Sequence, residues 1–78
     1  MRKQILDVAI DLLSKRERNM PRGETPFVTA QEVHDNLPQG CDASLSEVSI
    51  ILAANLTGKR CEIQMGADTF YVTRFTLS

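Results

Sequence analysis

The chain has 78 residues and a formal net charge of −1, with 42% hydrophobic and 24% charged residues. These proportions are typical of one small globular domain over residues 1–78 and argue against a disordered chain. A net charge this close to zero excludes a general attraction to nucleic acid or to an anionic membrane, so any such attraction must come from a local patch.

The apolar segments are too short for a membrane protein, because a spanning helix needs roughly 20 consecutive apolar residues. Near the N-terminus, Asp7 and Asp11 interrupt the apolar stretch, which therefore lacks the continuous core of an export signal. We expect a cytoplasmic protein, in which Cys41 and Cys61 are free thiols.

Residues 2–16 are predicted to form a helix, because apolar residues recur there with helical spacing. The apolar stripe consists of Ile5, Val8, Ala9, Leu12 and Leu13. Residues 17–26 contain prolines and a glycine, which indicate a loop. Arg16, Arg18 and Arg22 make this neighbourhood the most basic part of the chain, and Phe27 and Val28 follow as a predicted short strand.

A second helix is predicted to begin after Thr29. Thr29 and Glu32 have the spacing of a capping box, and Val28 and Val33 have that of the hydrophobic staple across it. The predicted buried stripe consists of Ala30, Val33 and Leu37, and the helix is expected to end at Pro38 and Gly40.

A third helix is predicted to begin after Ser44, which has the same capping-box spacing to Glu47. Ala43 and Val48 repeat the staple spacing more weakly. Gly58 is expected to cap the C-terminal end of this helix. The predicted core stripe consists of Leu45, Val48, Leu52 and Leu56, with Ile51 on its flank.

Residues 61–75 are predicted to form a β-hairpin. Pairing Met65 with Phe70 and Ile63 with Val72 collects the apolar residues on one face, which we expect to pack against the helices. That face consists of Cys61, Ile63, Met65, Phe70 and Val72, and the other face consists of Glu62, Gln64, Tyr71 and Thr73.

The order of helix, short strand, two helices and hairpin resembles the winged helix-turn-helix family. The resemblance is found in "VTAQEVHDNLP", "SLSEVSIILAANLTGKR" and the segments "CEIQM" and "TFYVTRF". It implies a DNA-binding transcription regulator whose third helix enters the major groove while the hairpin wing contacts the backbone or the minor groove. Compact regulators of this kind are common in phages and mobile elements.

By this resemblance, the preferred function is binding of double-stranded DNA. We expect groove contacts from Ser46, Ser49 and Ile50. Phosphate contacts are expected from Lys59, Arg60 and Arg74, although the first two would equally complement the dipole at a helix C-terminus. A homodimer would double this modest positive charge.

The residues of the third helix also favour an alternative, in which the protein is an adaptor or inhibitor that docks on another protein. The expected outer face has none of the Arg, Lys, Asn or Gln side chains that usually contact base edges. An exposed Ile50 beside small residues suits a protein interface with a partner such as RNA polymerase or another regulator. The residues expected to contact such a partner are Glu47, Ile50, Ala53, Ala54 and Tyr71.

The sequence predicts neither an enzyme nor a metal or cofactor site. His34 lies next to Asp35, but as a general base it would need both a nucleophile and an orienting partner, and the sequence supplies no recognisable pair. His34, Cys41 and Cys61 lack the paired spacings that structural zinc sites usually show.

Overall fold

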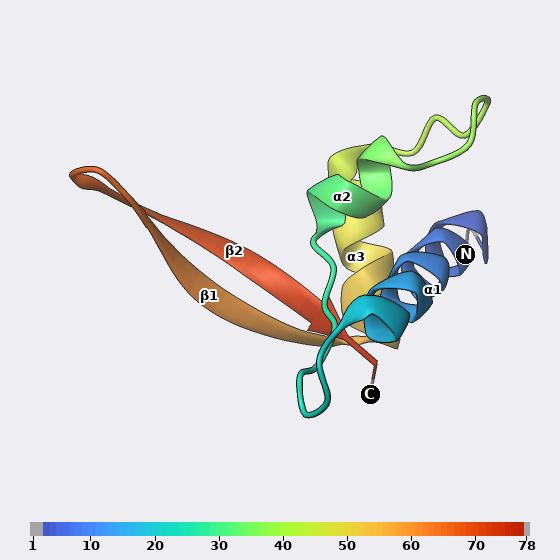
Figure 1. The fold of residues 1–78 in the computed structure, drawn as a ribbon. Coiled ribbons are helices and arrows are strands. Elements are labelled where there is room, and N and C mark those ends of the chain that lie inside the picture. Colours follow the sequence, from blue (N-terminus) through green and yellow to red (C-terminus); the bar gives the residue numbers. More distant parts are fainter. Residues whose placement is uncertain (1–2, 78) are drawn as a thin grey trace.

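The computed structural model describes residues 3–77, which form three helices followed by a two-stranded antiparallel hairpin. The helices are α1 (Lys3–Asn19), α2 (Ala30–Asp35) and α3 (Leu45–Asn55), and the strands are β1 (Thr57–Met65) and β2 (Asp68–Thr76). The helices lie together, and the hairpin extends away from them as an arm (Figure 1). The predicted α+β class is confirmed, and this order of elements is compatible with a winged helix.

The core lies where the helices meet the base of the hairpin. Ile5, Ala9 and Leu13 of α1 are fully buried, while Val8 and Leu12 are half-buried and pack against the core, as their helical spacing predicts. α1 continues past its predicted end at residue 16 to Asn19, whereas the predicted first residue of the helix, Arg2, lies outside the described residues. The other core residues are Val28, Val33, Ala43, Val48, Ile51, Leu52, Leu56 and Phe75.

The capping box at the start of α2 is confirmed. The Thr29 hydroxyl accepts a hydrogen bond from the backbone N–H of Glu32 at 3.3 Å, and the Glu32 carboxylate accepts one from the backbone N–H of Thr29 at 3.2 Å. Val28 and Val33, which flank this cap, are both fully buried in the core. Local chemistry therefore determines where α2 begins.

The base of the hairpin is joined to the helical part by the segment before α2. The backbones of Val28 and Phe75 exchange two hydrogen bonds, of 3.0 and 2.8 Å, which agrees with the short strand expected at Phe27 and Val28. The prediction that Gly58 caps the C-terminal end of α3 is wrong. α3 ends at Asn55 with Leu56 as its cap, and Gly58 lies in β1. A Cβ atom on Gly58 would lie 3.1 Å from the ring of Phe75, so the missing side chain makes room for this buried aromatic residue.

The predicted register of the hairpin is also wrong. Met65 pairs with Asp68 and Ile63 with Phe70, so only Gly66 and Ala67 form the turn. Gly66 has a φ of 65°, a conformation that glycine adopts readily at the first position of a two-residue hairpin turn. The predicted and observed registers differ by two residues on one strand and leave every side chain on the same face, so the hydrophobic pattern alone does not distinguish them.

The apolar face of the hairpin does not pack against the helices over most of its length. Among its side chains, those of Ile63, Met65 and Phe70 are exposed, whereas the buried contact with the core comes from Phe75 on the opposite face. The predicted faces are therefore correct, but the face that meets the core is the other one.

Candidate functional site

The outer face of α3 is the first candidate binding surface. Ser44 caps the helix by accepting a hydrogen bond from the backbone N–H of Glu47 at 3.2 Å, as the sequence predicts. Ile50 is 69% exposed. Most of the side chains proposed for contacts by this helix lie in solvent. Ser46, Ile50, Ala53 and Ala54 are exposed, while Glu47 and Ser49 are half-buried.

Leu45, at the start of α3, is not part of the buried core, which corrects the predicted stripe. Its side chain is 41% exposed, whereas Val48, Ile51 and Leu52 are buried. α3 packs against both α1 and α2, and this contact turns Ile51 inward. The other residues of the predicted stripe, Val48, Leu52 and Leu56, are buried, so the sequence pattern indicated the buried side of α3 correctly.

The cations expected to hold phosphates lie at the base of the hairpin. Lys59 and Arg60 lie in β1 and not in the last turn of α3, so they do not complement the helix dipole in the way considered above. They occupy opposite faces, because Lys59 pairs across the hairpin with Arg74 and Arg60 pairs with Thr73. The Arg60 guanidinium lies 4.3 Å from the ring centroid of Tyr71. The Arg74 guanidinium lies 4.3 Å from the ring centroid of Phe27.

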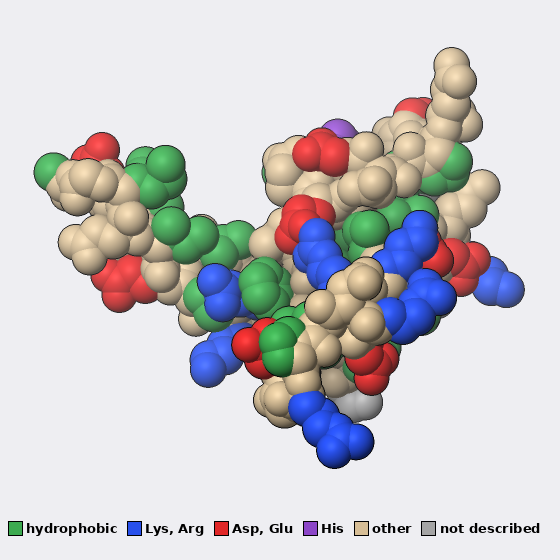
Figure 2. Space-filling model, in the orientation of Figure 1, with side chains coloured by type: hydrophobic (Ala, Val, Ile, Leu, Met, Phe, Trp, Pro, Cys, Tyr) green, Lys and Arg blue, Asp and Glu red, His purple; other side chains and the backbone are tan. Residues whose placement is uncertain are grey.

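A groove of about 310 Å³ separates the start of α3 from β2. Leu45 and Ser49 line its helical side, and Tyr71 and Thr73 line its strand side. Figure 2 shows the hairpin as an arm set apart from the helical part, with hydrophobic side chains along it. Local patterns give no sign of this groove, because it forms between segments far apart in the sequence.

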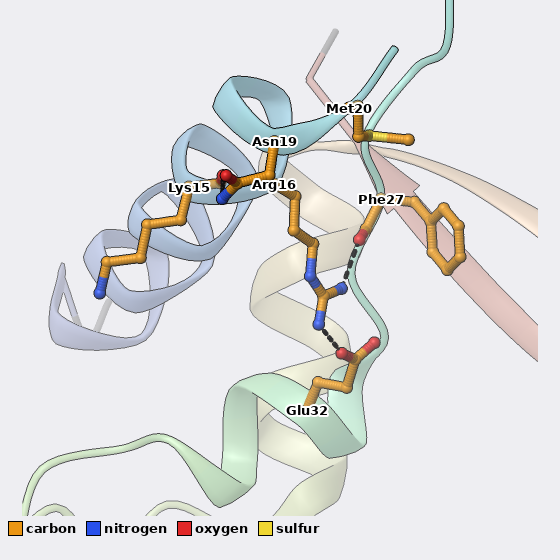
Figure 3. A pocket seen from close by; sticks show the side chains of 6 residues that line it. All are labelled: Lys15, Arg16, Asn19, Met20, Phe27 and Glu32. Carbon is orange, nitrogen blue, oxygen red and sulfur yellow. Dashed lines mark hydrogen bonds and ion pairs between the residues drawn. The ribbon is translucent and has the colours of Figure 1, made fainter.

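A second hollow, of about 450 Å³, lies between the end of α1 and the start of α2 (Figure 3). Arg16 and Glu32 form an ion pair at its wall, and Arg16 also donates a hydrogen bond to the backbone carbonyl of Phe27 at 2.6 Å. The Lys15 side chain extends away from this pair in the same view. The sequence indicates the cap at Glu32 but gives no sign of this contact with Arg16.

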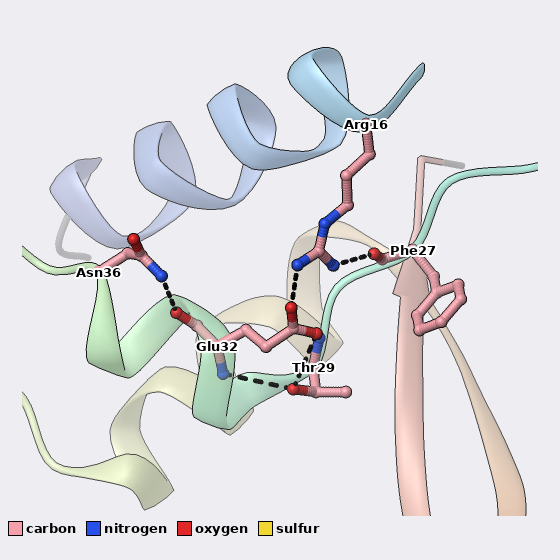
Figure 4. A network of polar contacts seen from close by, with 5 residues as sticks. All are labelled: Arg16, Phe27, Thr29, Glu32 and Asn36. Carbon is pink, nitrogen blue, oxygen red and sulfur yellow. Dashed lines mark hydrogen bonds and ion pairs between the residues drawn. The ribbon is translucent and has the colours of Figure 1, made fainter. Parts of the chain in front are cut away.

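The ion pair joins three segments of the chain (Figure 4). Glu32 binds Arg16 of α1 while it completes the cap with Thr29, and its backbone carbonyl accepts a hydrogen bond from the Asn36 side chain at 2.8 Å. The hydrogen bond from Arg16 holds the pKa of Glu32 below its ordinary value of 4.5, although partial burial acts in the opposite direction. We interpret Arg16 as a structural residue, because its charge is already paired.

His34 is the residue considered for catalysis, and Cys41 and Cys61 join it as the residues considered for metal binding. Nδ1 of His34 lies 3.6 Å from the nearer carboxylate oxygen of Asp35, which is too long for a hydrogen bond. Cys41 and Cys61 are free and half-buried. Within residues 3–77, no three His, Cys, Asp or Glu side chains gather as a metal ion would require.

Across the described part of the chain, no helix has both the length and the apolar character to cross a membrane. Comparisons with protein-family models, with curated proteins and with solved structures found no match.

Proposed function

We propose that the chain is a small, non-enzymatic binding module of the winged-helix type, and that it docks on another protein through the outer face of α3. The order of the helices and the C-terminal hairpin supports the winged-helix assignment. The backbone pairing of Val28 with Phe75 supports it further, because it joins the hairpin to the segment before α2.

The observation that carries this proposal is the exposed Ile50 on an outer face of α3 that has no basic side chain. Ile50 is exposed there beside the small side chains of Ser46, Ala53 and Ala54, and Glu47 is half-buried. The helix has no Lys or Arg between Leu45 and Asn55. Small residues allow a partner to approach closely, and a large aliphatic side chain at the centre gives it apolar surface to bury.

The groove beside α3 extends this surface. Tyr71 is exposed at its strand side, and the Arg60 guanidinium lies over the Tyr71 ring. Tyrosine and arginine are among the residues that contribute most to protein interfaces, since both combine a flat apolar surface with polar atoms. We expect a partner to insert a side chain between Leu45 and Tyr71.

DNA binding is the second candidate, and the position of the cations favours it. Lys59, Arg60 and Arg74 lie in the hairpin that follows α3, where a wing would contact phosphates, and Ser46, Ser49 and Ile50 would then face a groove. Arg16 is not available for this purpose, because it is paired with Glu32. Because few cations of residues 3–77 are placed in this hairpin, we expect DNA affinity to be weak and strongly salt-dependent.

Two variants distinguish these functions. If the partner is a protein, Ile50→Asp should weaken its binding by about tenfold or more, because a charge would lie at the desolvated centre of the interface. A double variant, Lys59→Ala with Arg60→Ala, should then change mainly the association rate. The measurement is affinity capture from cells of the source organism, with and without nuclease, using the wild type and both variants.

The DNA candidate predicts the opposite order. The slope of log affinity against log salt should fall by about 2 in the Lys59→Ala, Arg60→Ala variant, whereas Ile50→Ala should have little effect. Retention of mixed-sequence duplex DNA at about 50 mM salt, weakened by Lys59→Ala with Arg60→Ala and little changed by Ile50→Ala, would replace the protein proposal with the DNA one. Capture of a protein that survives nuclease and is lost in Ile50→Asp would support the protein proposal.

A further inference from the structure

One face of the hairpin has an apolar row along most of its length. Cys61 pairs with Val72 and Ile63 pairs with Phe70, and Met65 follows at the tip. Directly paired residues of an antiparallel hairpin share a face, so these five side chains form one continuous surface. The opposite face has polar residues at the corresponding positions.

This apolar row is largely uncovered. The side chains of Ile63, Met65 and Phe70 are 37%, 64% and 52% exposed, respectively. Scattered apolar side chains are normal on a protein surface, but a contiguous row on a projecting arm marks a contact surface. The position of this row on the hairpin separates it from the outer face of α3.

The charges on this face are arranged in order along the arm. Lys59 and Arg74 form a directly opposed pair at its base, and Asp68 lies at its tip beside Met65. Two like charges directly opposite each other destabilise a hairpin, and a nearby negative group would offset this, although the Arg74 guanidinium also lies over the Phe27 ring. Asp68 of the same chain is too far from them to supply it, because Asp68 and Arg74 are six positions apart along the strand, which is roughly 20 Å.

We propose that two copies of the chain pack these faces against each other, with their hairpins antiparallel. A two-fold axis between the faces and across the strands places the tip of one hairpin over the base of the other. Asp68 of each copy then meets Lys59 and Arg74 of its partner, and the apolar rows cover each other. A parallel arrangement would bring the four cations together, so the charges select the antiparallel one.

The size of the face determines the strength of this association. A nine-residue ribbon is roughly 30 Å long and about 10 Å wide, which is less than the ~800 Å² per partner of a standard stable interface. The dimer is therefore weak and forms reversibly at high protein concentration. Its formation does not depend on the function proposed for α3.

Sedimentation equilibrium tests this proposal. The apparent mass of the wild type should rise from 8.7 kDa towards twice that value between about 10 µM and about 1 mM, as expected for a weak interface. Asp68→Arg and Arg74→Asp should each weaken association by about tenfold, because each places like charges together. The double variant should restore association to within about threefold of the wild type, since the swapped charges meet again across the dimer.

Glu62→Arg is the matched control, because it reverses an acidic residue on the other face of the same hairpin. It should leave the association constant within about twofold of the wild type. Circular dichroism melts check that the variants fold, which matters for Arg74 because it also lies over Phe27. A wild type that stays monomeric throughout, a double variant without recovery, or a Glu62→Arg effect as large as that of Asp68→Arg would overturn the proposal.

Discussion

At the scale of single residues, Glu32 makes contacts with several segments of the described chain. Its carboxylate completes the cap of α2 and binds Arg16, and Arg16 in turn binds the backbone of Phe27. One side chain therefore links α1, the segment that pairs with the hairpin, and α2. Exposed ion pairs contribute little to stability, but this pair is half-buried and shares its hydrogen bonds with a helix cap.

The pH dependence of stability follows from this contact. The pKa of Glu32 is lower in the folded chain than its ordinary value of 4.5, so the stabilisation is present above that pH. It is lost as the pH falls below about 4.5 and through the folded-state pKa. Glu32→Gln should therefore lower the melting temperature at pH 7, and its difference from the wild type should shrink towards pH 3.

Thermal melts at both pH values measure this effect. Asp11→Asn is the control, because it removes the exposed i,i+4 pair of Asp11 with Lys15 on α1. We expect Asp11→Asn to change the melting temperature little at either pH. An unchanged difference between Glu32→Gln and the wild type from pH 7 to pH 3 would show that the charge of Glu32 is not the source of the stabilisation.

At the scale of elements, the helix starts follow local chemistry, while the end of α3 and the turn of the hairpin do not follow the prediction. Thr29 and Ser44 each accept a hydrogen bond from the third backbone N–H of the helix that they cap. Gly58 lies in β1, where the absence of a side chain allows the Phe75 ring to pack against the strand. The glycine thus has a tertiary role that its position after a helical pattern does not reveal.

The contribution of the α2 cap to the free energy of unfolding can be predicted. Thr29→Ala should lower the free energy of unfolding by about 1 kcal/mol, because a backbone N–H at the helix start loses its acceptor. Urea unfolding measures the change. Thr25→Ala, the same chemical change at an exposed loop position, should stay within about 0.5 kcal/mol of the wild type. Equal losses in the two variants would be inconsistent with a special role for the cap.

At the scale of the whole molecule, the chain is divided between a packed helical part and an arm. Phe75 is the hairpin residue that is buried in the core, whereas most of the apolar row on the other face of the hairpin is exposed to solvent. The helical part can therefore remain folded when the arm is altered, and the arm is free to contact a second molecule. The outer face of α3 and the apolar face of the hairpin are two separate surfaces of this arrangement.

Substitutions with aspartate test this division. Ile63→Asp should change the free energy of unfolding by less than about 1.5 kcal/mol, because Ile63 is exposed on the arm. Val33→Asp should prevent folding, since it buries an unpaired charge in the core. Urea unfolding at low protein concentration, where a dimer makes no contribution, compares the two. Loss of cooperative unfolding in Ile63→Asp would mean that the hairpin packs on the helices in solution.

The sequence by itself determined the elements of this protein and much of their local detail. Periodicity predicted the α1 stripe, capping chemistry predicted the starts of α2 and α3, and alternation predicted which hairpin residues share a face. Most of the residues proposed for contacts by α3 are exposed, as the pattern of that helix indicated.

Only the tertiary structure decided which apolar residues at the edges of the α3 stripe are buried. Leu45 and Ile51 both suit a core, and packing of α3 against two helices buried Ile51. Shifting the hairpin register by two residues preserves both faces, so the alternation of apolar and polar residues does not determine the register. The two-residue turn that begins at Gly66 determines it. The pairing of Phe75 with Val28 directed the hairpin outward, because it anchors the arm to the core at one end only.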